Sequence, residues 1–130
     1  MIDHIGISVS DISRSKRFYE QVLKSINYSI IMDLPAEVTG NVAAVGLGEN
    51  NKPDFWISES KGDILSNHIA FTVKNRKLVD DFYEAGTQAG GRDNGKPGIR
   101  EMYHPNYYGA FILDLDGHNI EAVCHLPEKN

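Results

Sequence analysis

The chain has 130 residues, with 13 basic and 18 acidic side chains and a formal net charge of −5. No basic run is present, which argues against a nucleic-acid-binding surface, because clustered Lys and Arg are needed to neutralise phosphates. No apolar stretch approaches the roughly 18 residues that cross a bilayer, and the N-terminus lacks the features of a signal peptide. A chain of this length suits one domain with a single core. The single cysteine cannot form an internal disulfide, so we expect the protein in the reducing cytoplasm.

Residues 2–9 form the first predicted element, in which apolar side chains alternate with small or polar ones. A period of two predicts a strand with one buried face. The face opposite the apolar side chains carries His4, Gly6 and Ser8. Asp11 or Ser10 can cap the helix that we expect over residues 11–24, where apolar side chains recur at roughly helical spacing.

Three more strands are expected before residue 60. They cover residues 28–32, 42–47 and 54–58. Pro35 interrupts the chain after the first of them, and the polar turn 48–51 separates the other two. The first part of the chain therefore predicts a β-α-β-β-β module over residues 2–60.

A second module with the same order of elements is expected over residues 66–125. Its first strand begins at Asn67 and places His68, Ala70 and Thr72 opposite the apolar face. Asn75 caps a helix that ends at the glycine pair 90–91.

The rest of the second module begins with residues 92–98, which are rich in glycine and predict a loop. The expected strands are 99–103, 108–114 and 119–124. A hairpin turn at Asp116-Gly117 joins the last two. We expect His118 in that turn to be solvated and Cys124 to belong to the core.

Residues 4–20 and 68–84 are two copies of one pattern, HIGISVSDISRSKRFYE and HIAFTVKNRKLVDDFYE, aligned without a gap. A repeat of this length indicates two like supersecondary units. Each module has one helix to cover one face of its sheet, which leaves the histidine-bearing face open. The expected fold is therefore α+β: two tandem βαβββ modules that form a curled eight-stranded mixed sheet, an open barrel around a cleft.

The paired modules, the histidine that opens each one, and the segment LDLDGHNIEAV at 113–123 resemble the vicinal oxygen chelate superfamily. That superfamily contains glyoxalase I, extradiol dioxygenases, and fosfomycin and bleomycin resistance proteins. The segments RDNGKPG at 92–98 and YHPNYYGAFILDLDGHNIEAV at 103–123 are most similar to its small glyoxalase-like members of unassigned activity.

The resemblance implies a divalent-metal site, whose ligands come from the first and last strands of each module. Matched residue by residue, the ligands are His4, His68 and Glu121, with Glu121 also acting in catalysis. Trp56 occupies the remaining ligand position and cannot bind a metal, which departs from the glyoxalase I pattern. Two histidines and one carboxylate suit iron, manganese, zinc or nickel with open positions for a substrate that offers two neighbouring oxygens.

Further candidates surround this metal site. His104 is either an acid/base residue on a loop that closes over the cleft or a residue of a surface loop with tyrosines packed at its base. Arg92 either anchors an anionic group or merely follows a helix end. Ser8 and Thr72 line the cleft wall. The expected stacking surfaces for a substrate are Trp56, Tyr107 and Tyr108.

Two function classes remain open from the sequence. The first is a metal-dependent enzyme, of lyase/isomerase or dioxygenase type, that acts on a small oxygenated molecule. The second is a metal-free protein of the bleomycin-resistance type that binds or sequesters a small planar compound. In either class we expect a homodimer, as in relatives of this size, and neither nucleic acid nor membrane as a partner.

Overall fold

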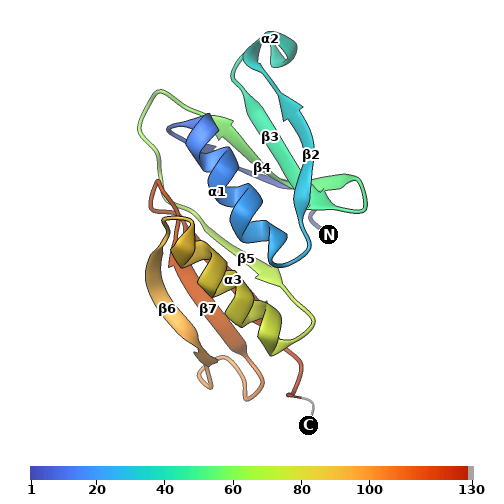
Figure 1. The fold of residues 1–130 in the computed structure, drawn as a ribbon, viewed down its shortest axis with the longest axis vertical. Coiled ribbons are helices and arrows are strands. Elements are labelled where there is room, and N and C mark those ends of the chain that lie inside the picture. The colour runs from blue at the N-terminus through green and yellow to red at the C-terminus, as the bar shows by residue number, and fades with distance from the viewer. Residues whose placement is uncertain (129–130) are drawn as a thin grey trace. The chain divides into compact units, whose positions relative to one another are not determined.

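The computed structural model describes residues 1–128, which form two compact units, Met1–Leu65 and Ser66 onward. Each unit has a four-stranded mixed sheet covered on one face by a long helix (Figure 1). Among the described residues, no helix has both the length and the apolar character that crossing a bilayer requires. The α+β class is confirmed, whereas the curled eight-stranded sheet stays a prediction because the strands pair as two separate sheets.

Unit 1 contains six elements. They are β1 (Ile5–Val9), α1 (Ile12–Lys24), β2 (Ser29–Leu34), α2 (Ala36–Thr39), β3 (Ala44–Glu49) and β4 (Lys52–Glu59). The strand order is β1-β4-β3-β2, with β1 parallel to β4 and the other pairs antiparallel. Asp11 caps α1 by accepting a hydrogen bond from the Arg14 amide at 3.2 Å, as its position predicts.

Unit 2 repeats this plan. Its elements are β5 (His68–Thr72), α3 (Arg76–Gln88), β6 (Arg92–Ile99), β7 (Tyr108–Leu113) and β8 (Asn119–Cys124). The strand order is β5-β8-β7-β6, again with the first and last strands parallel. Asn75 caps α3 through a 2.9 Å hydrogen bond from the Leu78 amide.

The core of each unit lies between its long helix and the facing side of its sheet. In unit 1, Tyr19 of α1 packs against Phe18 and against Phe55 of β4, with ring centroids 5.0 and 5.1 Å apart. In unit 2, Phe82 of α3 is fully buried, as is Ile112 of β7. Burying a side chain of this size contributes about 1.5–3 kcal/mol, so these contacts determine which sheet face is covered.

The sequence prediction was wrong for residues 92–103. The glycine-rich segment 92–98 is strand β6, and the expected strand 99–103 is instead mostly the turn that follows it. β6 is an edge strand with two register shifts, and Gly95 has a left-handed φ of 152°. Edge position and irregular register accommodate glycine and proline in a strand, and local composition alone does not reveal them.

Helix α2 was not predicted. Pro35, expected only to interrupt the chain, is its N-cap, and Gly40 ends it with a φ of 73°. A helix of four residues is too short to produce a periodic pattern.

The turn between β3 and β4 was predicted from its polar residues, and the structure has a turn there. Asn50 and Asn51 both have positive φ, at 52° and 61°, as in the common tight hairpin turns.

Candidate functional site

The open face of the unit 2 sheet brings His68 and Glu121 together. On β8, Ile120, Ala122 and Cys124 are buried in the core, so alternation directs Glu121 to the other face. Glu121 pairs with Ala70 of the neighbouring parallel strand, two residues beyond His68 and on the same strand face. His68 Nε2 consequently lies 2.8 Å from Glu121 Oε1, within hydrogen-bond distance.

Glu121 is a buried carboxylate, with only 1% of its side chain exposed, whereas the His68 side chain is 53% exposed. A buried carboxylate is costly unless cations or hydrogen-bond donors satisfy it. Here Oε1 faces His68, and Oε2 accepts a hydrogen bond from the Tyr107 hydroxyl. Burial and the neighbouring Glu121 carboxylate raise the pKa of the Tyr107 phenol well above its usual value, so Tyr107 is a neutral donor.

Four rings gather beside Glu121 in a group that we call the ring cluster: Tyr103, His104, Tyr107 and His125. Ring centroids lie 4.7 Å apart for Tyr103–Tyr107, 5.6 Å for His104–Tyr107 and 5.3 Å for Tyr107–His125. His104 Nδ1 accepts from the Asn106 amide at 3.1 Å, so the neutral His104 ring carries its proton on Nε2. That Nε2 donates to His125 Nδ1 at 2.9 Å, which uses both nitrogens of His104.

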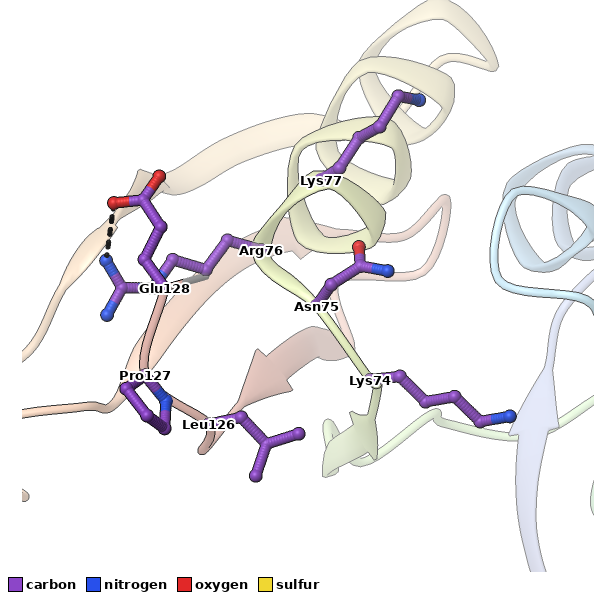
Figure 2. A pocket seen from close by; sticks show the side chains of 7 residues that line it. All are labelled: Lys74, Asn75, Arg76, Lys77, Leu126, Pro127 and Glu128. Atoms are coloured by element: carbon purple, nitrogen blue, oxygen red, sulfur yellow. Dashed lines mark hydrogen bonds and ion pairs between the residues drawn. The ribbon is translucent and has the colours of Figure 1, made fainter. Parts of the chain in front are cut away.

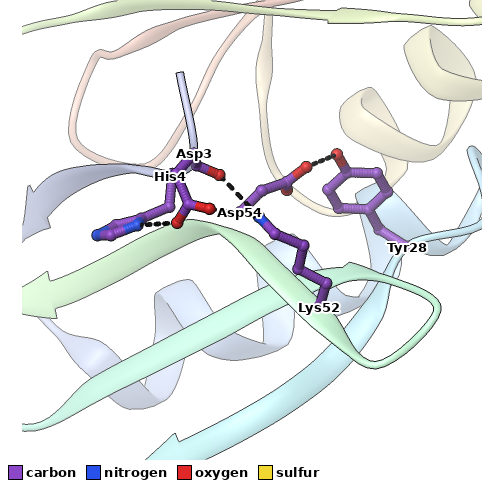
Figure 3. Close-up of polar contacts among 5 residues, drawn as sticks. All are labelled: Asp3, His4, Tyr28, Lys52 and Asp54. Carbon is purple, nitrogen blue, oxygen red and sulfur yellow. Dashed lines mark hydrogen bonds and ion pairs between the residues drawn. The ribbon is translucent and has the colours of Figure 1, made fainter. Parts of the chain in front are cut away.

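His4, the third expected ligand, belongs to unit 1. Its Nδ1 bonds the neighbouring Asp3 carboxylate at 2.7 Å, and Lys52 holds the same carboxylate at 3.1 Å (Figure 3). These contacts lower the pKa of Asp3, through the hydrogen bond from His4 first and then through Lys52. The His4 side chain is 58% exposed, so its ring remains accessible.

Trp56 stands in unit 1 where Glu121 stands in unit 2. Gly6 pairs with Trp56 across β1 and β4, and Ala70, its repeat counterpart, pairs with Glu121 across β5 and β8. The Trp56 indole lies over Gly46. A Cβ added to Gly46 would be 2.9 Å from the Cζ2 and Cη2 atoms of the indole. The tryptophan therefore replaces a carboxylate at an equivalent point of the open face.

The other predicted site residues are dispersed. Tyr108 lies on the helix side of its sheet and donates to Asp80 of α3 at 2.6 Å, so it does not share a face with Tyr107. Arg92 is exposed on β6. Ser8 and Thr72 are exposed on β1 and β5, where alternation places them on the open faces as expected.

Two features were missed or misjudged. Arg100 follows β6, bonds the carbonyls of Gly98 and Lys96 at 2.9 and 2.7 Å, and lies 5.4 Å from the Phe111 ring centroid on the open-face side. No local pattern singled it out. His118 is fully buried rather than solvated, because its Nδ1 accepts from the Asn67 amide at 2.9 Å.

Two surface cavities lie outside this group of residues. One, of about 380 Å³, is formed by the start of α3 and residues 126–128, where Arg76 pairs with Glu128 at 3.4 Å (Figure 2). The other, of about 530 Å³, runs along α1 beside Tyr28. The lining of each, within the described part of the chain, contains none of the predicted site residues.

The donors of unit 2 suit a divalent cation as part of a larger set. Two ligands bound to one ion at about 2.1 Å are about 3 Å apart when adjacent, close to the 2.8 Å between His68 Nε2 and Glu121 Oε1. A buried carboxylate whose partners are a half-exposed imidazole and a phenol also favours a cation. Among residues 1–128 no three His, Cys, Asp or Glu side chains are gathered as a complete set.

Comparison with known proteins agrees with these features. The FosB metallothiol transferase of Staphylococcus haemolyticus is 28% identical over 125 residues, covering 92% of this chain and 80% of the relative. A glyoxalase/bleomycin resistance protein from Albidiferax ferrireducens T118 has a TM-score of 0.76 at 23% identity, covering 94% of this chain and 97% of its own.

A third relative is a variant of the fosfomycin resistance protein FosX from Listeria monocytogenes, solved with Mn(II) and 1S,2S-dihydroxypropylphosphonic acid. It has a TM-score of 0.68 at 18% identity, covering 95% of this chain and 90% of its own. The family description "Glyoxalase/Bleomycin resistance protein/Dioxygenase superfamily" matches residues 1–122, nearly the whole chain. The chain therefore belongs to the glyoxalase/bleomycin resistance protein/dioxygenase superfamily.

Proposed function

We propose that this protein is a divalent-metal-dependent enzyme that acts on a small oxygenated molecule, by lyase, isomerase or dioxygenase chemistry. The observation that carries the proposal is the contact between His68 and the buried carboxylate of Glu121. His4 would complete the ligand set, within one chain or across a homodimer, with the two sheets curled around a shared cleft. Iron, manganese, zinc and nickel all accept such donors.

A bound metal would supply Lewis-acid stabilisation of negative charge on a substrate's neighbouring oxygens. The chain's own residues would hold and orient the reactants. Glu121 would also take or return a proton, and His104 is kept as a second acid/base candidate. Ser8, Thr72 and Arg92 are the proposed substrate contacts. The FosB name, metallothiol transferase, supports metal-dependent group transfer as a related reaction class.

Metal analysis of protein purified without chelator tests this proposal. The wild-type protein should carry close to one equivalent of one divalent metal, and His68→Ala and Glu121→Ala should lose it while remaining folded. Glu101→Ala is the matched control, because Glu101 is an exposed carboxylate in the turn after β6. A Glu121→Ala protein with full metal occupancy would contradict the ligand assignment.

The second candidate is a metal-free binding protein, and Trp56 supports it. An aromatic plane replaces a metal ligand on the open face of unit 1, over a glycine that leaves it room. Such a surface suits stacking of a planar compound. Because Trp56 is the chain's single tryptophan, a bound aromatic compound should quench the protein's indole fluorescence, and loss of metal should not change that affinity.

The homodimer is also part of the proposal. Light scattering should give twice the 14.5 kDa mass of one chain. A single species at the mass of one chain at micromolar concentration would instead require His4 and His68 to meet within one molecule.

A further inference from the structure

The two oxygens of the Glu121 carboxylate have different partners. Oε1 lies 2.8 Å from His68 Nε2, and Oε2 accepts the hydrogen bond from the Tyr107 hydroxyl. A carboxylate can bind a divalent cation through one oxygen or through both. With its second oxygen occupied by a phenol, Glu121 has one oxygen left beside His68.

The Tyr107 ring is held independently of Glu121. The other three rings of the ring cluster pack against it, with centroids 4.7–5.6 Å away. Its backbone is also fixed, because its amide donates to the His104 carbonyl at 3.1 Å and its carbonyl accepts from the Arg100 amide at 2.8 Å. The hydroxyl is therefore presented to Glu121 by a rigid support.

Gly109 makes this approach possible. A Cβ built at Gly109 would lie 3.1 Å from Tyr107 Cε1 and 3.3 Å from Glu121 Oε2, closer than ordinary van der Waals contact. Gly109 pairs with Val123 of β8, beside Glu121. The residue at position 109 must be small for the phenol and the carboxylate to meet.

We propose that Tyr107 is a positioning residue that fixes the orientation of the Glu121 carboxylate, so that Oε1 alone is offered beside His68 as a donor to a divalent cation. The inference rests on the proposed function for the identity of the ligand. It adds a specific role for Tyr107: holding Glu121 as a one-oxygen ligand.

Tyr108 provides a matched control for Tyr107. Tyr107 immediately precedes β7 and Tyr108 is its first residue. Both donate to a carboxylate, but the partner of Tyr108 is Asp80 on the opposite face. The experiment titrates Co²⁺ into metal-free wild-type, Tyr107→Phe and Tyr108→Phe proteins and records the visible d–d spectrum. Co²⁺ serves as the probe because this spectrum reports the number and geometry of its ligands.

Tyr107→Phe frees Oε2, so the Co²⁺ spectrum should change towards higher coordination. Loss of an outer hydrogen-bond partner should also weaken Co²⁺ binding about 10–100-fold. Tyr108→Phe should leave spectrum and affinity unchanged. Gly109→Ala keeps the hydroxyl but displaces the ring, so it should reproduce the change of Tyr107→Phe. Identical spectra and affinities for wild type and Tyr107→Phe would overturn the proposal.

Crystal structures of the metal-free wild type and Tyr107→Phe separate this inference from the proposed function. A wild-type protein that takes up no Co²⁺ refutes the metal function. The orientation of Glu121 is decided separately: a turned or doubled carboxylate in Tyr107→Phe supports positioning by Tyr107, and an unchanged one refutes it.

Discussion

Glycine at position 46 determines where the indole of Trp56 can lie. An added Cβ would be 2.9 Å from the indole and equally close to Pro53 Cβ, too close for any real contact. Gly6, on the other side of Trp56, differs, because a Cβ there would be 3.7 Å from Trp56 Cβ. Both glycines therefore lie beside Trp56, but only Gly6 has room for a methyl group.

Gly46→Ala should displace the indole and shift the emission of the protein's single tryptophan. Overpacking of this kind costs about 1–3 kcal/mol in the free energy of unfolding, which urea denaturation can measure. Gly6→Ala is the control and should leave the emission maximum unchanged. Equal emission maxima in the two variants would mean that Trp56 does not lie over Gly46.

Two partly buried phenols, those of Tyr107 and Tyr108, make this protein sensitive to alkaline pH. Burial and the Asp80 carboxylate raise the pKa of Tyr108 to about 12. The Tyr107 pKa is raised by burial and Glu121. An unfolded tyrosine titrates near 10, so the unfolded chain loses these protons first. The resulting stabilisation is complete below pH about 10 and is lost as pH rises through the folded values.

The free energy of unfolding of the wild type should therefore fall above pH about 10, and that of Tyr107→Phe should fall less steeply. Urea denaturation of both proteins at a series of alkaline pH values measures the difference. Parallel curves would show that the Tyr107 phenol is not buried against Glu121.

At the scale of elements, α3 depends on one capping side chain. Asn75 accepts the Leu78 amide hydrogen bond at 2.9 Å, and Gly86 lets the helix approach β7 so closely that an added Cβ would be 2.3 Å from Ile112 Cδ1. The cap sets where the helix starts, and the glycine sets how close it packs. Together they position β7, whose preceding segment carries Tyr107, and the neighbouring β8, which carries Glu121.

Asn75→Ala should lower the free energy of unfolding by about 1 kcal/mol, because it removes the acceptor for an otherwise unpaired helix amide. Asn75→Asp keeps an acceptor and should stay close to wild type. Urea denaturation distinguishes them, and equal loss in both variants would show that the amide group of Asn75 acts in some other way.

At the scale of the whole molecule, the proposed ligands are divided between the two units. His68 and Glu121 belong to unit 2, and His4 belongs to unit 1. In the proposed site, the third donor would come from unit 1 of the same chain or of a second copy. This division makes the assembly of the site testable by mixing variants.

His4→Ala should abolish tight metal uptake as completely as His68→Ala does. Co-expression of the two single variants then locates the site, since mixed dimers recover metal only when His4 and His68 come from different chains. Metal analysis of the purified mixture measures the recovery. Full occupancy in His4→Ala alone would remove His4 from the ligand set.

The order of a strand, a helix and three further strands in each module was correctly predicted from the sequence, apart from the short helix α2. The repeat aligned His4 with His68, and alternation correctly assigned Ile120, Ala122 and Cys124 to the core. These features depend on residue order and on the periods of strands and helices, which are local. The family resemblance followed from the same local patterns and is confirmed over residues 1–122.

The contacts between side chains that are distant in the sequence became known from the fold alone. The pairing of β7 with β8 brings Tyr107 to Glu121, which lies 14 residues away in the sequence. The same pairing brings His125, which follows β8, to His104, which lies 21 residues away and precedes β7. The glycine-rich segment 92–98 is likewise a strand because its backbone pairs with that of β7. Contacts between distant segments depend on strand register and on space left by residues such as Gly109, which no local pattern encodes.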